Sequence, residues 1–238
     1  MTIKGKAVLV TGADRGIGQA LVEEALRRGA RRVYAGTRGP MTHHDKRVTP
    51  VVLDVTDPAQ IQAAVESLDI LVNNAGVALY DDLSDRAVLE EHFAVNVLGP
   101  HDVTQAFLPL LTRSQGAIVN NASMMAFAPL PLTPAYAISK AALFNMTQSL
   151  RALLAPRGVR VHAVLTGPTD TDMTRGFEIP KATAESVARA IFDGVENGDE
   201  DIFPDPLSDM LADSWRNGPA KAFEHQYAAL VNATPIAS

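Results

Sequence analysis

Residues 7–18 have the sequence AVLVTGADRGIG. The apolar run Ala7–Val10 predicts a buried strand, and the amphipathic segment Ile17–Arg28 predicts a helix directly after it. Between them lie glycines spaced Gly-x3-Gly-x-Gly, which permit a tight turn and a close approach of the backbone to a bound group. The helix N-terminus that follows is a place where phosphate groups bind. The segment therefore predicts a strand–turn–helix unit with a phosphate site, and a glycine-rich turn without a ligand is the alternative.

The rest of the chain repeats this alternation of apolar strands and amphipathic helices. Further strands are predicted at Arg32–Gly36, Val48–Asp54, Asp69–Asn73, Ala117–Ala122, Val159–Leu165 and Asp201–Phe203. Further helices are predicted at Pro58–Leu68, Ser84–Thr112 with an interruption at Gly99-Pro100, Pro134–Ala155, Ala184–Asn197, and two tail pieces from Pro206 separated near Gly218-Pro219. This alternation is typical of a parallel sheet with helices on both faces. We expect an α/β fold with a doubly wound (Rossmann) seven-stranded sheet, and ligands beyond the carboxyl ends of its strands.

Length and composition limit the class of protein. The chain has 238 residues and no marked linker, which predicts a single domain over 1–238, with a cofactor half at about 1–122 and a substrate half at about 123–238. A net charge of −6 argues against a nucleic-acid partner, and the absence of cysteine excludes disulfides and thiolate metal sites. We predict no metal. The sequence lacks a signal-peptide pattern and a membrane-spanning apolar run, so we expect a cytoplasmic protein with no membrane partner.

The end of the second predicted strand bears on which dinucleotide binds. An acidic residue about 20 positions past a glycine-rich turn typically holds the ribose hydroxyls of NAD. Here the strand leads into Thr37-Arg38, and no acid stands at that place. Arg38, with Arg15 inside the turn, would attract the 2′-phosphate of NADP instead. These residues favour NADP(H) over NAD, and two solvated surface arginines are the alternative.

Tyr136 and Lys140 stand four residues apart on a predicted helix, and therefore on one face. A tyrosine hydroxyl has a reference pKa of about 10, too high for efficient acid–base catalysis near neutrality. A nearby ammonium favours the phenolate, so we expect Lys140 to lower the pKa of Tyr136 toward the working range of a general acid/base. The alternative is that Tyr136 and Lys140 are an ordinary pair of side chains on the surface of the helix.

Several motifs that bear on function follow one another along the chain. They are Thr11–Gly18, Asn73-Asn74-Ala75-Gly76, Asn96, Ser123 and Tyr136-x3-Lys140. With these motifs the chain resembles the short-chain dehydrogenase/reductase family from about Gly5 to Pro204. The resemblance implies a single-domain NAD(P) oxidoreductase that acts on alcohols and carbonyls and assembles as a homodimer or homotetramer.

The resemblance also implies catalytic roles. Tyr136 matches the general acid/base that protonates the carbonyl oxygen, and Ser123 matches the hydroxyl that holds the same oxygen. Lys140 matches the lysine that lowers the tyrosine pKa and binds the nicotinamide ribose. Asn96 matches the asparagine that holds a water in the proton relay.

The expected cofactor residues lie along the same edge of the sheet. Asp54 matches the acid that bonds the adenine amino group, and Val55 supplies a backbone contact. The full expected set is Gly12, Arg15, Gly16, Ile17, Gly18, Thr37, Arg38, Asp54, Val55, Asn74, Ala75, Gly76, Tyr136, Lys140, Gly167, Thr169 and Thr171. Two residues depart from the family pattern: Thr166 stands where a proline is usual, which bears on the rigidity of the loop, and Ala122 replaces a frequent serine.

Apolar residues flank the expected catalytic groups. Ser123, Met125, Tyr136 and Met173 are the predicted substrate-binding residues, and further candidates for the pocket wall are Met124, Phe127, Leu130, Leu132, Phe177 and Ile179. Methionine suits irregular apolar surfaces, so we expect a hydrophobic ketone, aldehyde or secondary alcohol. Packing in the core or at a subunit interface is the alternative for each of these side chains.

Three functions fit such a fold. The first is an NADP(H)-dependent carbonyl reductase or alcohol dehydrogenase. The second is a non-catalytic NADP(H) sensor, which the presence of both Tyr136 and Lys140 disfavours. The third is an epimerase or dehydratase of the extended relatives, which generally carry a larger C-terminal substrate domain than the short tail here can form.

Overall fold

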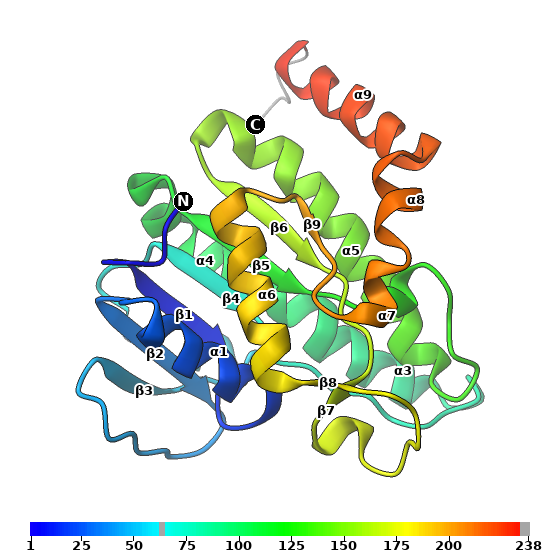
Figure 1. The fold of residues 1–238 in the computed structure, drawn as a ribbon, viewed down its shortest axis with the longest axis horizontal. Coiled ribbons are helices and arrows are strands. Elements are labelled where there is room, and N and C mark those ends of the chain that lie inside the picture. The colour runs from blue at the N-terminus through cyan, green and yellow to red at the C-terminus, as the bar shows by residue number, and fades with distance from the viewer. Residues whose placement is uncertain (62–64, 234–238) are drawn as a thin grey trace.

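The computed structural model describes residues 1–61 and 65–233. Its main sheet has seven strands, all parallel, in the order β3-β2-β1-β4-β5-β6-β9 (Figure 1). The strands are β1 Ala7–Thr11, β2 Arg32–Thr37, β3 Val48–Val52, β4 Ile70–Asn73, β5 Ala117–Asn121, β6 Arg160–Val164 and β9 Asp201–Ile202. The helices are α1 Gly16–Arg27, α2 Pro58–Ile61, α3 Arg86–Phe93, α4 Gly99–Ser114, α5 Pro134–Leu154, α6 Ala184–Asn197, α7 Pro206–Asp209, α8 Ala212–Arg216 and α9 Pro219–Ala233.

The strand order confirms the doubly wound sheet. From β1 the chain builds outward through β2 and β3, then returns to place β4 on the other side of β1. Connections that leave in opposite directions open a crevice at the carboxyl ends of β1 and β4. The start of α1 and the loops that follow β4, β5 and β6 all meet at this edge.

The core lies in two layers, one on each face of the sheet. Successive strand residues point to opposite faces, so Val8 and Val10 pack against α1 and α6, whereas Ala7 and Leu9 pack against α4 and α5. Figure 1 shows α1 and α6 in front of the sheet and α4 behind it. Because both faces are covered, the strands are nearly continuous apolar runs, as the sequence predicted.

The predicted helix Ser84–Thr112 is wrong in its interruption. Instead of breaking at Gly99, the chain passes from α3 through the π turn Ala94–Leu98 straight into α4. Gly99 is there for packing, because a Cβ at this position would lie 2.7 Å from Val55 Cγ2. The π turn contains Asn96, one of the predicted catalytic residues.

Other boundaries also differ. Of the predicted helix Pro58–Leu68, only Pro58–Ile61 is helical, residues 65–68 are not, and residues 62–64 lie outside the described part. The tail forms α7, α8 and α9 rather than two pieces, although the break before α9 falls at Gly218 as expected. A second, two-stranded sheet of β7 Thr169–Asp170 and β8 Ala182–Thr183 was not predicted.

No helix in the two described ranges is both long enough and apolar enough to span a membrane.

Candidate functional site

The glycine-rich turn depends on its glycines for two separate reasons. Gly12 and Gly16 have φ of +65° and +53°, which side chains other than glycine rarely adopt. At Gly18 the reason is close approach, since a Cβ there would lie 1.9 Å from the Gly12 carbonyl oxygen. The backbone therefore folds tightly onto the start of α1.

The N-terminus of α1 is built to receive an anion. The residue before the helix, Arg15, is extended, and no described side chain caps the helix at this end. The first turn of α1 contains no acidic residue. Its free backbone N–H groups and the positive end of the helix dipole therefore face the crevice, which suits a pyrophosphate.

The segment after β4 packs directly on this turn. Asn74 Nδ2 donates hydrogen bonds to the carbonyl oxygens of Thr11, at 3.0 Å, and Gly12, at 3.2 Å. Thr11 Oγ1 accepts from the backbone N–H groups of Asn74 and Ala75, both at 3.0 Å. Sequence reasoning expected this strip beside the adenosine ribose, and the structure shows that it also fixes the shape of the glycine-rich turn.

The ends of β2 and β3 bring Arg38 close to Asp54. Thr37 is buried and Arg38 is exposed. Asp54 accepts hydrogen bonds from the Thr56 backbone at 2.9 Å and the Thr56 hydroxyl at 2.7 Å. These bonds, with a smaller contribution from Arg38, hold the pKa of Asp54 below its usual value. Asp54 is therefore an ionised acceptor beside an exposed guanidinium.

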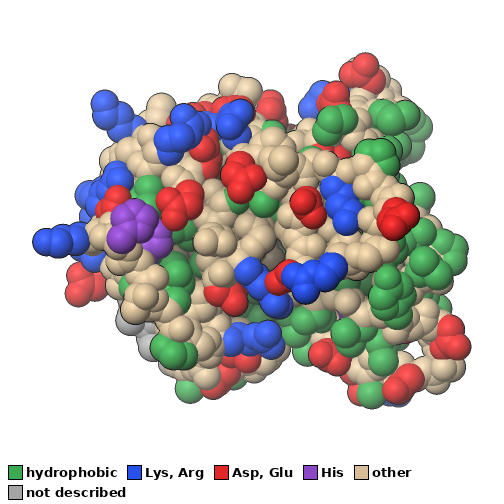
Figure 2. Space-filling view, turned by 60° about the horizontal axis from the view of Figure 1, so that its bottom comes forward, with side chains coloured by type: hydrophobic (Ala, Val, Ile, Leu, Met, Phe, Trp, Pro, Cys, Tyr) green, Lys and Arg blue, Asp and Glu red, His purple; other side chains and the backbone are tan. Residues whose placement is uncertain are grey.

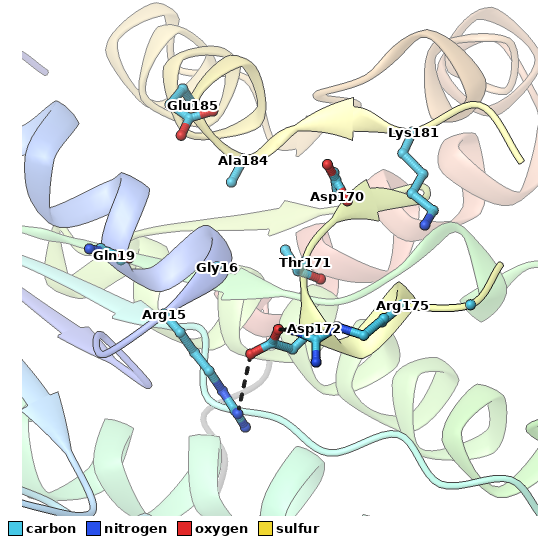
Figure 3. Close-up of a pocket in the computed structure, with 11 residues that line it drawn as sticks. Arg15, Gly16, Gln19, Asp170, Thr171, Asp172, Arg175, Lys181, Ala184 and Glu185 are labelled. Carbon is cyan, nitrogen blue, oxygen red and sulfur yellow. Dashed lines mark hydrogen bonds and ion pairs between the residues drawn. The ribbon is translucent and has the colours of Figure 1, made fainter. Parts of the chain in front are cut away.

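Arg15 does not join Arg38 in this structure. Its Nη1 lies 3.6 Å from Oδ2 of Asp172, in the segment that follows β7 (Figure 3). A cleft of about 530 Å³ lies between the start of α1 and this segment. Its lining residues are Arg15, Gly16, Gln19, Asp170, Thr171, Asp172, Arg175, Gly176, Lys181, Ala184 and Glu185. Both members of the ion pair are largely exposed, so Arg15 is held only weakly there.

Three of the four predicted catalytic side chains converge at the ends of β5 and α5. Ser123 follows β5 and caps the 3-10 turn Met124–Ala126, where its Oγ accepts from the Met125 N–H at 3.1 Å. Tyr136 lies in the first turn of α5 and Lys140 one turn later. The Lys140 Nζ is 5.5 Å from the centroid of the Tyr136 ring, and the Ser123 hydroxyl is near enough to lower the tyrosine's pKa in part. A carbonyl oxygen placed between the two hydroxyls would meet both.

Burial controls the protonation of this pair. Desolvation raises the pKa of Tyr136 to about 12, and the Ser123 hydroxyl opposes this rise only in part. Desolvation likewise lowers the pKa of Lys140 to about 8. The prediction that the ammonium lowers the tyrosine pKa is therefore wrong for this structure. One reason is that Lys140 Nζ donates to the Asn121 carbonyl, at 2.7 Å, rather than to the phenol oxygen.

Asn96 is buried in the π turn next to these groups. Its Oδ1 accepts from the Val77 N–H at 2.9 Å, and its Nδ2 donates to the Val77 carbonyl at 2.9 Å and to Ser139 Oγ at 3.0 Å. A Cβ added at Gly76 would lie 3.1 Å from Asn96 Oδ1 and 3.6 Å from Lys140 Nζ. Gly76 therefore leaves space between the asparagine and the lysine.

The loop after β6 is fixed by the C-terminal part of the chain. Asp205, at the start of α7, accepts from the Gly167 N–H at 2.7 Å. A side chain at Gly167 would overlap this carboxylate, with Cβ 2.3 Å from Oδ1. Thr169 is buried in β7, and Thr171 Oγ1 donates to its carbonyl at 3.4 Å. The loop thus runs across the mouth of the crevice.

Several of the apolar residues predicted for the pocket wall are partly exposed. Met173, Ile179 and Leu132 are about half exposed, and the Phe177 ring stacks on Tyr80 with centroids 6.0 Å apart. Figure 2, which brings the lower end of Figure 1 forward, shows charged groups near the centre of this face and hydrophobic groups on its right. Phe127 packs against Phe144 and Trp215, which is the packing alternative for this residue.

Sequence reasoning missed three residues of this region. His92 is fully buried, and its ring lies edge-on to Tyr136 with centroids 6.4 Å apart. Its Nε2 accepts from the Leu79 N–H at 3.1 Å, and its Nδ1 donates to the Val88 carbonyl at 2.7 Å. The second is Tyr80, whose ring stacks on Phe177. The third is Asn121, which no sequence signal distinguished from its neighbour Asn120.

A doubly wound sheet with a glycine-rich turn and a buried serine, tyrosine and lysine at one edge defines a dinucleotide-dependent oxidoreductase fold. The sequence model of the short chain dehydrogenase family matches residues 6–181, and the chain belongs to this family. A crystal structure of a short chain dehydrogenase from Burkholderia cenocepacia J2315 in complex with NADP is 35% identical, with a TM-score of 0.87, and covers 95% of this chain and 98% of that one.

Curated relatives agree with this assignment. Oxidoreductase UcpA of Escherichia coli K12 is 32% identical over 213 residues, which are 79% of this chain and 81% of the relative. Estradiol 17-beta-dehydrogenase 2 of Mus musculus is 36% identical over 199 residues. That match covers 75% of this chain but only 52% of the mouse protein, so the chain spans about half the length of this relative.

Proposed function

We propose that the protein is an NADP(H)-dependent oxidoreductase that transfers hydride between the nicotinamide and a carbonyl or secondary alcohol. The observation that carries this proposal is the convergence of Ser123, Tyr136 and Lys140 at the sheet edge that also holds the glycine-rich turn. The turn suits a pyrophosphate, and the three side chains suit proton transfer to a carbonyl oxygen. One edge of the sheet thus combines both halves of a reductase site.

The residues present fit a dinucleotide. Gly16 puts no side chain into the cleft that it lines together with Thr171, and the start of α1 is uncapped among the described residues. Gly16, Ile17 and Gly18 would hold the pyrophosphate, and Asn74, Ala75 and Gly76 would lie along the adenosine. Asp54 and Val55 would contact the adenine. Gly167, Thr169 and Thr171 would contact the nicotinamide amide and the phosphates.

The proton chemistry follows from the pKa values. The bound dinucleotide supplies or accepts the hydride. A pKa of about 12 keeps Tyr136 protonated at neutral pH, which is the form that donates a proton to a carbonyl oxygen during reduction. Ser123 holds the same oxygen by its hydroxyl. Lys140, protonated below about pH 8, would bind the nicotinamide ribose. Asn96 would hold a water that returns the proton.

We propose NADP(H) rather than NAD(H), because Arg38 is exposed beside Asp54, where a 2′-phosphate would lie. The Burkholderia relative was solved with NADP, which supports this choice. Arg15 would reach the phosphate only by leaving Asp172. Replacing Arg38 with Asp removes one attraction and adds a repulsion, so affinity for NADPH should fall by about tenfold to a hundredfold, with little change for NADH.

Fluorescence titration with both dinucleotides measures this effect. Arg32→Asp is a matched control, because Arg32 is exposed at the opposite end of β2 and its side chain donates to Thr49. Equal losses for NADPH and NADH in Arg38→Asp would refute the assignment of the phosphate site.

We propose an apolar ketone, aldehyde or secondary alcohol as substrate, held by Ser123, Met125, Tyr136 and Met173. The half-exposed apolar side chains predicted for the pocket wall favour it, and the mouse relative is named for an apolar alcohol, estradiol. From the family resemblance we also propose a homodimer or homotetramer that works in the cytoplasm.

The test is a carbonyl panel with NADPH and NADH. Wild type should oxidise NADPH faster with aryl and alkyl ketones than with small charged carbonyls. Tyr136→Phe should lower kcat by about a hundredfold to ten-thousandfold and leave NADPH affinity nearly unchanged, because only the proton donor is lost. Tyr227→Phe, at an exposed position on α9, is the control. Tight NADPH binding without turnover on any carbonyl would favour the sensor instead.

A further inference from the structure

Thr166 and Asn121 form a buried hydrogen bond directly behind the catalytic side chains. Thr166 Oγ1 donates to Asn121 Oδ1 at 2.6 Å, and both residues are 8% exposed. Thr166 follows β6, and Asn121 ends the neighbouring strand β5. Thr166 is the residue that stands where the family usually has a proline. Its hydroxyl therefore holds the loop by a hydrogen bond that a proline could not form.

The main chain of the same two residues holds the catalytic groups. The Thr166 carbonyl accepts from Ser123 Oγ at 3.3 Å, and the Asn121 carbonyl accepts from Lys140 Nζ at 2.7 Å. The Met124 N–H also donates to the Thr166 carbonyl, at 3.1 Å. The side-chain bond therefore joins the two residues whose carbonyls set the positions of Ser123 and Lys140.

The network continues to the glycine-rich turn. Asn121 Nδ2 donates to Asn74 Oδ1 at 3.0 Å, and Asn74 Nδ2 donates to the Thr11 and Gly12 carbonyls. Side-chain amides and one hydroxyl thus cross the carboxyl ends of β6, β5, β4 and β1 without a gap. Both polar groups of the Asn121 amide are used within it.

We propose that Thr166 and Asn121 are a positioning pair that fixes Ser123 and Lys140 relative to each other; this inference rests on the proposed function. Neither side chain touches the reacting atoms. Catalytic groups must be held within about 0.5 Å of the productive geometry, and a satisfied buried bond between their supports provides that restraint. Losing the bond leaves Asn121 Oδ1 without this donor and frees both carbonyls to shift.

The fold supplies a matched control one residue away. Asn120 Nδ2 donates to Thr147 Oγ1 at 2.9 Å, and both residues are fully buried. This pair also joins a β5 amide to a threonine hydroxyl, but it faces α5 and holds no catalytic group. Thr147→Val and Thr166→Val therefore remove comparable bonds, and only the second removes a support of the site.

The experiment compares kcat, the substrate KM and Tm for these variants. Thr166→Val should lower kcat about tenfold with KM within about twofold, as expected for loss of one buried hydrogen bond that acts on alignment. Thr166→Ser should restore kcat. The double variant Asn121→Leu/Thr166→Val should lose no more kcat than Asn121→Leu alone, because Asn121→Leu already removes the bond that Thr166→Val removes. Thr147→Val should lower Tm yet keep kcat.

A second readout is independent of turnover. In protein labelled with ¹³C at lysine Cε, the Lys140 signal, assigned by its loss in Lys140→Met, should shift in Thr166→Val, return in Thr166→Ser and stay in place in Thr147→Val. An unmoved Lys140 signal in Thr166→Val overturns the positioning pair even if no carbonyl substrate is found. Equal kcat losses in Thr147→Val and Thr166→Val would overturn it as well. Failure of wild type to turn over any carbonyl counts against the proposed function only.

Discussion

Burial of the Lys140 ammonium in the site destabilises the folded state. Its side chain is 4% exposed, and its ammonium has the Asn121 carbonyl as acceptor. Burial holds its pKa at about 8, against a usual value of 10.5. A lysine with a lowered pKa destabilises the folded state while it is charged. This cost is fully present below pH 8 and disappears as the pH rises to 10.5, because there the folded protein has already lost the proton that the unfolded chain still binds.

Lys140→Met tests this directly. The measured quantity is the free energy of unfolding of Lys140→Met minus that of wild type. This difference should be largest below pH 8 and should fall by at most about 3 kcal/mol between pH 8 and 10.5. The bond to Asn121 is also lost in the variant, which offsets part of this difference, so the change with pH is the quantity to measure. Urea unfolding across this range gives it, with exposed Lys46→Met as the background for replacing a lysine. Parallel pH profiles for Lys140→Met and wild type would show that Lys140 is not desolvated.

At the scale of elements, a buried ionic cluster attaches the C-terminal helices to α5 and β9. Asp201, with its side chain 2% exposed, accepts from Arg151 and Trp215 at 2.7 Å and from Lys221 at 2.6 Å. Burial by itself would raise the pKa of Asp201, but Arg151 and Lys221 hold it below its usual value. Glu224 completes the cluster with contacts to Arg151 and Lys221.

Asp201→Asn should destabilise the protein by about 3–5 kcal/mol, because Arg151 and Lys221 would remain buried with less compensation. Thermal unfolding at neutral pH measures the loss, and Asp213→Asn on exposed α8 is the control. The affinity for NADPH should change little, since the cluster lies away from the glycine-rich turn. A fall in Tm no larger than that of Asp213→Asn would mean that the cluster contributes nothing to stability.

The elements also show which features local sequence predicts. The strands followed from their short apolar runs, because helices cover both faces of the sheet. Helices α1, α5 and α6 followed from helical periodicity, because each buries one face in the core. Gly99 was misread as a helix break, since its close contact with Val55 depends on how α4 crosses the loop after β3. The short β7–β8 pair has no periodicity that a sequence could show. Its existence depends on where the loop after β6 meets the start of α6.

At the scale of the molecule, the site arises from topology. The reversal between β3 and β4 opens a crevice, and the parallel strands bring Gly12, Asn74, Ser123 and Thr166 to the same edge from four separate parts of the sequence. The family motifs predicted which residues meet there. They did not predict how charge is distributed: Arg15 bonds Asp172 instead of joining Arg38, and burial rather than Lys140 controls the pKa of Tyr136. Both depend on side-chain environments that form only after folding.

The proposed reaction is the transfer of hydride from NADPH to a carbonyl carbon at this edge of the sheet. The test is to incubate the protein with an apolar ketone and NADPH that carries two deuterium atoms at the nicotinamide C4, and to analyse the alcohol by mass spectrometry. We expect one deuterium on the carbinol carbon with wild type, and at least about a hundredfold less labelled alcohol with Tyr136→Phe over the same time. Tight binding of NADPH with no deuterium in any alcohol, across the ketones and aldehydes of the panel, would refute the proposed hydride transfer.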